Sequence, residues 1–458
     1  MGSEIKYIEL SKLLSSAPRN GLYKGKEFQG SGHRWIKMSE IYGNSFFDKQ
    51  KTELIEVTES ERDRFSCMTG DLLFGRTSLI LEGVGDCLLV EEVDDSPIFE
   101  SNLFRIRFDL TKACPRFYFY YFQSILGKQL IQKIAKQTAA ASITASDLID
   151  QPVPYFDVVM ERRISAFIYL FDKKIQLNRE TNKTLEQMAQ ALFKSWFVDF
   201  DPVIDNALAA GKPIPEELQA RAQRRQQQLA KPDHQPLPDE VRQLFPSEFE
   251  ETEELGWVPK GWEATTFGQV SICFDKNRVP LSKKQREEKK PGTIPYYGAT
   301  SVMDHINEWI FDDIYLLIGE DGSVIKEDGS PFVQYVWGKT WVNNHAHVLQ
   351  GNDGISTEHI MIFMQSQDIN AYVTGAVQLK INQGNLNRIP FLKATNDLNC
   401  VFAEKISSIY CKVRQVSETI NSLTKLRDTL LPKLISGELR LPESLLDSET
   451  NPPESAYE

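Results

Sequence analysis

The chain repeats itself at a distance of 238 positions. With this shift and no gap, the aligned pairs include Ile143 with Ile381, Leu148 with Leu386, Pro152 with Pro390, Ile168 with Ile406, Leu185 with Leu423 and Leu192 with Leu430. A self-match of this extent indicates two copies of one structural unit in tandem. The chain must therefore fold into two similar halves.

Each copy ends in a segment that is typical of a long helix. Residues 161–200 contain neither proline nor glycine, and apolar or seam residues recur every three or four positions. This stripe comprises Ile164, Ile168, Phe171, Ile175, Asn178, Asn182, Leu185, Leu192 and Trp196. The second stripe, in residues 398–437, comprises Ile406, Ile409, Val413, Val416, Ile420, Leu423, Leu426 and Leu430, with Pro432 near its end and Gly437 as the expected C-cap. About 40 helical residues extend roughly 60 Å, so each helix is expected to span between globules.

Two amphipathic helices of matched length bury their stripes most simply against each other. We expect an antiparallel pair with the globules at its two ends. Asn178 and Asn182 then face Val416 and Ile420 on the second helix. Two interpretations stay open for these asparagines: they fix the register of the pair as buried polar residues, or they turn to solvent.

The predicted fold is therefore α+β. Two mixed α/β globules are separated by two long antiparallel coiled-coil helices, as a pseudo-two-fold tandem repeat. The expected divisions are a first globule at 1–155, a helix at 156–200, a linker with a short helix and an acidic stretch at 201–255, a second globule at 256–395, a second helix at 396–440 and a disordered acidic tail at 441–458. A chain of 458 residues accommodates two to four domains.

The net charge of −12 is concentrated in two segments. Residues 238–255 carry seven acids and one arginine, and residues 442–458 carry five acids and no base. The rest of the chain is nearly neutral, so net charge neither supports nor excludes a DNA-binding face. We interpret both acidic segments as solvated linker and tail.

Cysteine usage and hydropathy predict a cytoplasmic protein. The six cysteines are scattered and form no CxxC pair, which fits a reducing compartment without disulfides or a zinc ribbon. No secretory signal precedes the first globule, and no run approaches the ~18 apolar residues of a membrane span.

Motifs for catalysis are missing from the sequence. It contains no GxxxxGK[ST], no HExxH and no GxSxG. The stretch NPPE at 451–454 lacks the aromatic fourth residue with which methyltransferases stack on an extruded base. His345 and His347 flank Ala346 as a conceivable metal pair, but no cluster of cysteines or carboxylates completes a ligand shell, so a structural pair is favoured. We therefore expect no catalytic site and no metal.

Several stretches resemble one protein family. The strings LNRETN at 177–182 and LEQMAQALFKSWFVDF at 185–200 closely resemble the central conserved helix of type I restriction-modification specificity subunits. The string LRDTLLPKLISGEL at 426–439 resembles their distal conserved helix. GDLLF at 70–74 and WVNNHAHVL at 341–349 resemble segments of their target-recognition domains. The resemblance covers nearly the whole chain in the family's order.

The resemblance implies a non-catalytic subunit that reads DNA. Each target-recognition domain would read one half of a bipartite, asymmetric double-stranded site, and the helices would act as spacers. Two modification subunits would bind S-adenosylmethionine and methylate adenine. Restriction subunits, which are ATP- and Mg-dependent translocases with a nuclease, would complete the complex in phage defence. No cofactor is expected on this chain itself.

Candidate DNA contacts follow from the chemistry of readout, which needs cations for phosphates and planar polar groups for base edges. The candidates in the first globule are Lys37, Arg76, Thr77, Lys136 and Gln137, and those in the second are Lys339, Asn343, Asn344, Gln378 and Lys380. The lysine-rich segment 275–290 either follows the DNA backbone or forms a flexible solvated loop. The alternative for each candidate is an ordinary surface or turn residue without a DNA contact.

Candidate docking residues lie at the helix ends. They are Phe193, Trp196 and Phe197 on the first helix and Leu431, Leu434 and Leu439 on the second. The alternative for the first three is that they are core residues that cap the helix pair. Two rival functions also stay open: a helical scaffold with two protein-binding globules and no DNA contact, and a fused enzyme with an unrecognised active site.

Overall fold

The computed structural model describes residues 5–43, 46–78, 81–137, 140–232, 235–322, 324–375 and 378–442. The chain divides into two compact units, formed by residues 1–179 with 418–458 and by residues 180–417. Within the described ranges, no helix combines the length and apolar character that crossing a membrane requires. The predicted tail at 441–458 lies outside the described residues apart from its first two positions.

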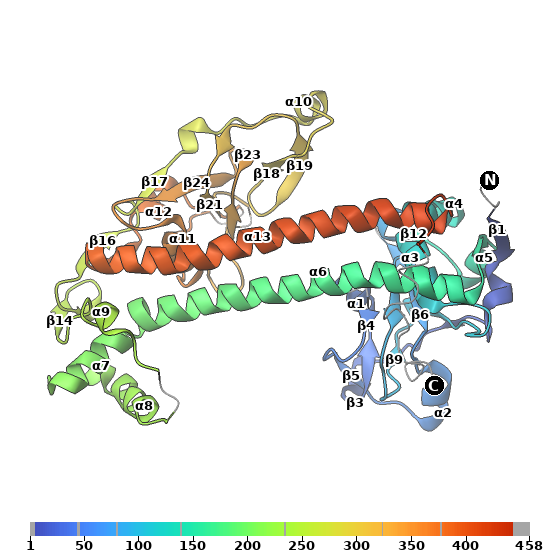
Figure 1. The fold of residues 1–458 in the computed structure, drawn as a ribbon, viewed down its shortest axis with the longest axis horizontal. Helices are drawn as coiled ribbons and strands as arrows, with labels where there is room; N and C mark the ends of the chain where they lie inside the picture. Colours follow the sequence, from blue (N-terminus) through green and yellow to red (C-terminus); the bar gives the residue numbers. More distant parts are fainter. Residues whose placement is uncertain are drawn as a thin grey trace. The chain divides into compact units, whose positions relative to one another are not determined.

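The first unit is built on a five-stranded sheet with the order β2-β10-β6-β8-β4. The unit also contains the smaller sheets β5-β3-β9, β11-β12-β7 and β1-β13, and several of their strands are labelled in Figure 1. The elements are β1 (Lys6–Glu9), β2 (Arg19–Asn20), β3 (Gln29–Ile36), α1 (Met38–Gly43), β4 (Phe46–Phe47), β5 (Leu54–Ile55), α2 (Glu59–Phe65), β6 (Leu72–Gly75), β7 (Thr77–Ser78), β8 (Cys87–Val90), β9 (Ile98–Phe99), β10 (Leu103–Ile106), α3 (Pro115–Gln123), α4 (Ile125–Ile134), β11 (Lys136–Gln137), β12 (Ala141–Ser142), α5 (Ala145–Ile149) and β13 (Pro152–Tyr155).

The central strands of this sheet are buried on both faces. Leu72 and Phe74 of β6 pack into one core with α3, whereas Leu73 between them packs into a second core with Ile36 and Phe47. Side chains alternate between the faces of a strand, so a sheet that is covered on both sides needs continuous apolar runs. This explains why the sequence reads as the apolar string LLF rather than as an alternating pattern.

The second unit contains two four-stranded sheets, β17-β24-β21-β22 and β19-β18-β23-β20, and the pairs β16-β25 and β14-β15. Its elements are α7 (Asp201–Ala210), α8 (Gln219–Leu229), α9 (Asp239–Arg242), β14 (Phe249–Thr252), β15 (Gly256–Pro259), β16 (Glu263–Thr266), β17 (Ser271–Cys273), α10 (Lys283–Glu288), β18 (Ile294–Tyr297), β19 (Val302–Ile306), β20 (Phe311–Asp312), β21 (Tyr315–Gly319), β22 (Val333–Val336), β23 (Lys339–Val342), β24 (Ala346–Gly351), α11 (Thr357–Gln365), α12 (Gln383–Asn387) and β25 (Pro390–Lys393).

The structure repeats with the same period as the sequence. Helix α12 spans the positions of α5 shifted by 238, and β25 spans those of β13 with the same shift. Upstream the correspondence continues with other offsets, because the sheet order β10-β6-β8 recurs as β24-β21-β22. The predicted α+β class, with two sheet-rich globules and two long helices, is confirmed.

Both long helices are present. Helix α6 (Val158–Phe193) continues as a π-helical turn over Lys194–Val198, and α13 spans Asn396–Ile435 with Pro432 inside it. Gly437 follows with a φ of +63°, the left-handed C-cap conformation that the sequence predicts. Within each unit the segments of the two helices run antiparallel (Figure 1), with Asp172 bonded to Arg427 in the first unit and Asn182 bonded to Ser417 in the second.

The seam asparagines face the helix pair. The side-chain amide of Asn182 donates to the Ser417 hydroxyl at 2.8 Å and to the Val413 carbonyl at 3.3 Å. Asn178 is buried, with only 7% of its surface exposed. The interpretation that these residues turn to solvent is therefore wrong, and Asn182 can favour one register because only one alignment places Ser417 beside it.

The region predicted as a linker is largely ordered. The helical run of α6 and its π-helical turn ends at Val198, before Asp201-Pro202, which instead begins α7 because proline is tolerated in the first turn of a helix. The predicted short helical piece is confirmed as α8. In the acidic stretch, β14 pairs with β15, and Phe245 is buried in the core of the second unit. The solvated-linker interpretation of this stretch is thus wrong, since its apolar residues anchor it while its acids face outward.

A buried carboxyl joins the first globule to α6. Glu161, in the first turn of the helix, is fully buried and accepts hydrogen bonds from the Cys114 amide at 2.8 Å and the Tyr118 hydroxyl at 2.9 Å. Burial raises the pKa of Glu161 to about 7, because desolvation disfavours the charged form.

The raised pKa of Glu161 predicts that the stability of the folded chain depends on pH. The unfolded chain ionises Glu161 near its ordinary pKa of about 4.3, whereas the folded chain retains the proton up to about pH 7. Folding therefore loses stability as pH rises through this window, by roughly 3–4 kcal/mol, and the penalty is constant above it. Glu161→Gln should stabilise the chain at pH 8 and leave it nearly unchanged at pH 5, as chemical unfolding at both values will measure. Equal effects of the substitution at the two pH values would contradict this assignment.

Candidate nucleic-acid interface

Three loops meet at one edge of the second globule. The Glu320 amide donates to the His345 carbonyl at 2.8 Å, and the Gly322 amide donates to the Leu379 carbonyl at 3.0 Å. Bridges also join Lys380 to Asp321 and to Thr374. Residues 320–322, 343–345, 374–375 and 378–380 therefore form one surface, which we call the second loop cluster.

The first globule carries the same arrangement. Ser142 in β12 pairs with Lys136 in β11 and with Thr77 in β7. Thr374 and Lys380, which pair in the second globule, lie 238 positions after Lys136 and Ser142. The strands β7, β11 and β12, with residues 101 and 102, form the first loop cluster, because the Arg76 amide donates to the Asn102 carbonyl at 3.0 Å.

The sequence-predicted residues of the first globule mostly converge there. Thr77 is exposed, and Lys136 pairs with Asp147 at 2.9 Å while remaining largely exposed. The Arg76 guanidinium donates to the Ser101 carbonyl at 3.1 Å, which holds it against the loop. Gln137 has its backbone in β11, but its side chain lies outside the described residues. Lys37 pairs with Glu53 at 2.5 Å and lies over the Trp35 ring, so its charge is already compensated.

The predicted residues of the second globule divide into three groups. Asn344 and Gln378 are exposed on the second loop cluster, and Lys380 lies there with its ammonium 3.3 Å from Glu320. Asn343 is buried and its side-chain oxygen accepts from the His345 amide at 2.8 Å, so it shapes the turn rather than reading bases. Lys339, at the other end of β23, lies over the Trp309 ring at 3.6 Å and does not belong to the cluster.

A network of largely buried charged and polar side chains supports the second loop cluster. Arg278 donates to Glu320 at 2.8 Å and to the Ala346 carbonyl at 2.7 Å. His347 contacts Asp275 through Nδ1 at 2.5 Å and the Ile381 carbonyl through Nε2 at 2.9 Å. Buried charges are stable when they are paired and hydrogen-bonded in this way. The network fixes the loops from beneath, and no sequence motif signals residues that are this far apart in the chain.

The histidines do not form a metal pair. His345 lies in the turn before β24 and pairs with Asp321 at 2.6 Å, whereas His347 is bonded on both ring nitrogens. The ligand atoms of Cys273, Asp275 and His347 lie within 4.8 Å of one another. Both ring nitrogens of His347 already have hydrogen-bond partners, and in the metal-free chain burial raises the pKa of the Cys273 thiol to about 12. These residues fit an internal hydrogen-bonded group better than a metal centre.

Asn102 is the residue that the sequence analysis missed in the first globule. It is exposed in the turn before β10, as Asn344 is exposed in the turn before β24. These two strands occupy equivalent places in the sheets. The self-alignment did not extend to this part of the chain, so only the structure reveals the pair.

The lysine-rich segment is partly ordered rather than a flexible loop. Residues Lys283–Glu288 form α10, which Ser282 and Gln285 close with a capping box. Arg286 pairs with Asp304, and Lys289 pairs with Glu308. Much of the positive charge of this segment is therefore neutralised within the globule.

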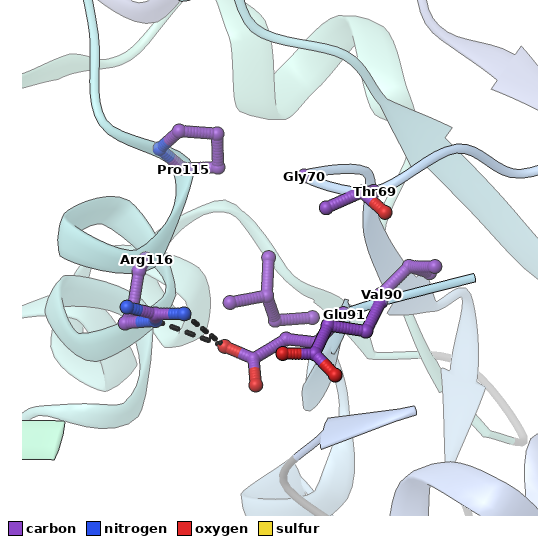
Figure 2. A pocket seen from close by; sticks show the side chains of 8 residues that line it. Thr69, Gly70, Val90, Glu91, Pro115 and Arg116 are labelled. Atoms are coloured by element: carbon purple, nitrogen blue, oxygen red, sulfur yellow. Dashed lines mark hydrogen bonds and ion pairs between the residues drawn. The ribbon is translucent and has the colours of Figure 1, made fainter. Parts of the chain in front are cut away.

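At the pocket between β8 and α3, a cation of the first globule forms an ion pair within the protein. Figure 2 shows Arg116 turned toward Glu91, with which it pairs at 2.7 Å. Tyr169 of α6 donates to the same carboxylate at 3.1 Å and lies under the Arg116 guanidinium. The pocket has a volume of about 30 Å³, room for no more than a few water molecules. Arg116 thus joins the globule to α6, and this pocket is too small for a nucleotide.

The predicted docking residues on α6 are core residues. Phe193, Trp196 and Phe197 are 4%, 1% and 7% exposed. All three pack against Phe402 of α13, and Phe193 and Phe197 also contact the His359 ring. A buried side chain offers no surface to a partner, so the alternative interpretation as helix-capping core is the correct one.

The predicted docking residues on α13 divide differently. Leu431 and Leu434 are buried in the core of the first unit, which corrects their assignment as docking residues, whereas Leu439 is 38% exposed. The outward-facing apolar residues of the long helices include Leu170, Leu177, Met188 and Leu426, with exposed fractions of 59%, 53%, 54% and 47%. Leu426, which the sequence pattern places on the seam, therefore faces outward.

Comparisons with known proteins identify the family. Residues 259–392 match the model of the type I restriction modification DNA specificity domain. The chain is similar to the HindI specificity subunit of Haemophilus influenzae, with 26% identity over 88% of this chain and 94% of that one. It is also similar to the MjaIX specificity subunit of Methanocaldococcus jannaschii, with 20% identity over 92% of this chain and 90% of that one.

A structural comparison adds a crystal structure of a type I restriction-modification S subunit from M. genitalium, with 15% identity, a TM-score of 0.49 and coverage of 95% of this chain and 97% of that one. The family resemblance that the helix motifs indicate is confirmed by the specificity-domain match and the curated relatives. The specificity-domain match and the similarity over most of the chain to curated relatives indicate a specificity subunit of a type I restriction-modification system.

Proposed function

We propose that the chain reads a bipartite, asymmetric DNA sequence, one half with each globule. The observation that carries this proposal is the recurrence of the loop cluster, with Asn102 exposed on the first and Asn344 on the second. Asparagine pairs bidentately with adenine in the major groove, and nearby lysines such as Lys136 and Lys380 supply charge for phosphates. Thr77 and Gln378 complete the candidate contacts.

Continuous helices suit the role of spacer between half-sites. Helix α6 has 36 residues and α13 has 40, which correspond to roughly 54 and 60 Å of helix. The bonds of Asn182 and Arg427 each connect the two helices and oppose their sliding. A fixed helix length sets a fixed number of base pairs between the two sequences that are read.

Partner subunits supply the chemistry in this proposal. Two modification subunits bind S-adenosylmethionine and methylate adenine, and restriction subunits use ATP and Mg for translocation and cleavage. No catalysis is assigned to this chain. Methyl transfer should therefore be absent from the purified chain and appear when the modification subunits are added.

Salt-dependent binding tests the DNA-reading role. The complex of this chain with its modification subunits should bind duplex DNA with an affinity that falls steeply as salt rises, because contacts to phosphates release counterions. A specific duplex should bind at least about 10³-fold more tightly than a random one. Binding with no salt slope would favour the scaffold alternative, and methyl transfer by the chain alone would favour the fused enzyme.

The outward-facing leucines predict where the modification subunits dock. Leu170 and Leu177 lie two helical turns apart on α6, with exposed fractions of 59% and 53%. Replacing both by glutamate should weaken assembly at least about 10-fold, because charges would be buried against an apolar partner surface. Analytical ultracentrifugation with the modification subunits measures this.

Tyr42→Glu is the matched control, since Tyr42 is also 59% exposed but lies on α1 of the globule. Assembly should survive this substitution. If the leucine double variant assembles like the Tyr42 variant, the modification subunits dock elsewhere.

A further inference from the structure

Each globule holds one large, exposed side chain beside its loop cluster. Tyr23 in the first globule is 83% exposed, and Met303 in the second is 54% exposed. Neither residue belongs to the polar and charged candidates discussed above. Single exposed apolar residues are common on protein surfaces, so the position of these two beside the loop clusters distinguishes them rather than their exposure alone.

The loop that carries Tyr23 is anchored on both sides. Leu22 is buried, and its amide donates to the Phe99 carbonyl at 2.9 Å. Lys24 donates to the Glu56 carbonyl at 2.8 Å and pairs with Glu61 at 2.8 Å. Tyr23 is therefore exposed although the backbone on both sides of it is anchored.

Met303 is also held in place. The side-chain amide of Asn343 donates to its sulfur at 3.3 Å, which ties it to the turn that presents Asn344. Gly298 leaves room for the methionine, because a Cβ at that position would approach the Met303 sulfur to 2.7 Å. The thioether thus lies against the second loop cluster with half of its surface exposed.

The two side chains lie near corresponding backbone pairings of the repeat. Leu22 forms a parallel bridge with Glu100, and Tyr297 forms a parallel pair with Val342. In both globules the following amide, of Ser101 or of Asn343, donates to the carbonyl of the bridged residue, at 3.0 and 3.1 Å. Tyr23 comes directly after Leu22, and Met303 projects from the hairpin that follows Tyr297.

We propose that Tyr23 and Met303 each press against base edges of one half of the DNA site and supply the apolar part of sequence readout. This inference rests on the proposed DNA-reading function. Phosphates are bound by cations and dipoles, whereas the thymine methyl group and the faces of unstacked bases are contacted by apolar and aromatic side chains. An exposed apolar residue beside an exposed asparagine matches a base edge better than a phosphate.

The test compares Tyr23→Ser and Met303→Ser in the complete complex with its modification subunits. Each substitution should weaken binding to the specific duplex about 10-fold, the loss expected for one base contact. Binding to random duplex and the salt slope should not change, because no charge is removed. Mapping of methylated adenines should show that each variant relaxes only one half of the recognised sequence.

Matched controls are Tyr7→Ser and Ile272→Ser, at residues that are 57% and 43% exposed on β1 and β17, outside both loop clusters. They should bind the specific duplex like the wild type, and Tyr23→Phe and Met303→Leu should retain most of the affinity. Serine variants that bind like their controls would overturn the inference while leaving the proposed function intact. A wild-type complex without sequence-selective binding would overturn both.

Discussion

We expect Asn344→Ala to lower the affinity of the complex for its DNA site about 10- to 100-fold, the range that a bidentate contact between an amide and a base contributes. Asn344 is exposed at the second loop cluster, so its loss should not disturb the core. The wild-type salt slope should persist, because the phosphate contacts are unchanged. Competition binding with duplexes that carry every single-base change in each half-site measures the effect.

Asn102→Ala is the reciprocal control. It should relax the half-site that the first globule reads and leave the other half unchanged, whereas Asn344→Ala should do the reverse. Asn307→Ala, at another exposed asparagine of the second globule, should change neither half. Equal relaxation of both halves by either variant would show that the globules do not read separate sequences.

The largest expected loss of stability follows from Trp196→Ala. Trp196 is 1% exposed, and its ring lies 5.7 Å from that of Phe402 and 5.1 Å from that of Phe245. Removing a buried indole from a core should cost about 3–5 kcal/mol, from lost apolar burial and the cavity that remains. Chemical denaturation followed by circular dichroism measures the change in the free energy of unfolding.

Trp196→Phe separates the core role from docking. It should recover much of the lost stability, and the folded variant should assemble with the modification subunits as the wild type does. A Trp196→Phe variant with wild-type stability but impaired assembly would restore the docking role that the burial of this residue argues against.

Much of the architecture is predictable because it follows from patterns of neighbouring residues in the sequence. The 3.6-residue stripe and the lack of proline and glycine predicted the long helices, and the repeat from Ile143 onward predicted two related globules. The repeat upstream of Ile143 was not detectable. Insertions change the offset there, from 238 for α12 and β25 to other values, so no single shift aligns both sheets.

The sites were less predictable because they depend on contacts between distant residues. Residue type alone predicts candidate DNA contacts, but Lys37 and Lys339 are occupied by neighbouring groups and Asn343 is buried. The network of Arg278, Glu320 and His347 joins residues that no spacing rule connects. The sequence pattern of an aromatic cluster such as that around Trp196 is the same whether the cluster packs in the core or binds a partner.

The central claim is that two equivalent loop clusters read two separate half-sites for one methyltransferase. The most direct measurement is a genome-wide map of methylated adenines in host cells with and without the gene for this chain. We expect a split, asymmetric motif that is methylated when the gene is present and unmethylated when it is deleted. A map that does not change on deletion, or a motif without a gap between its halves, would contradict it.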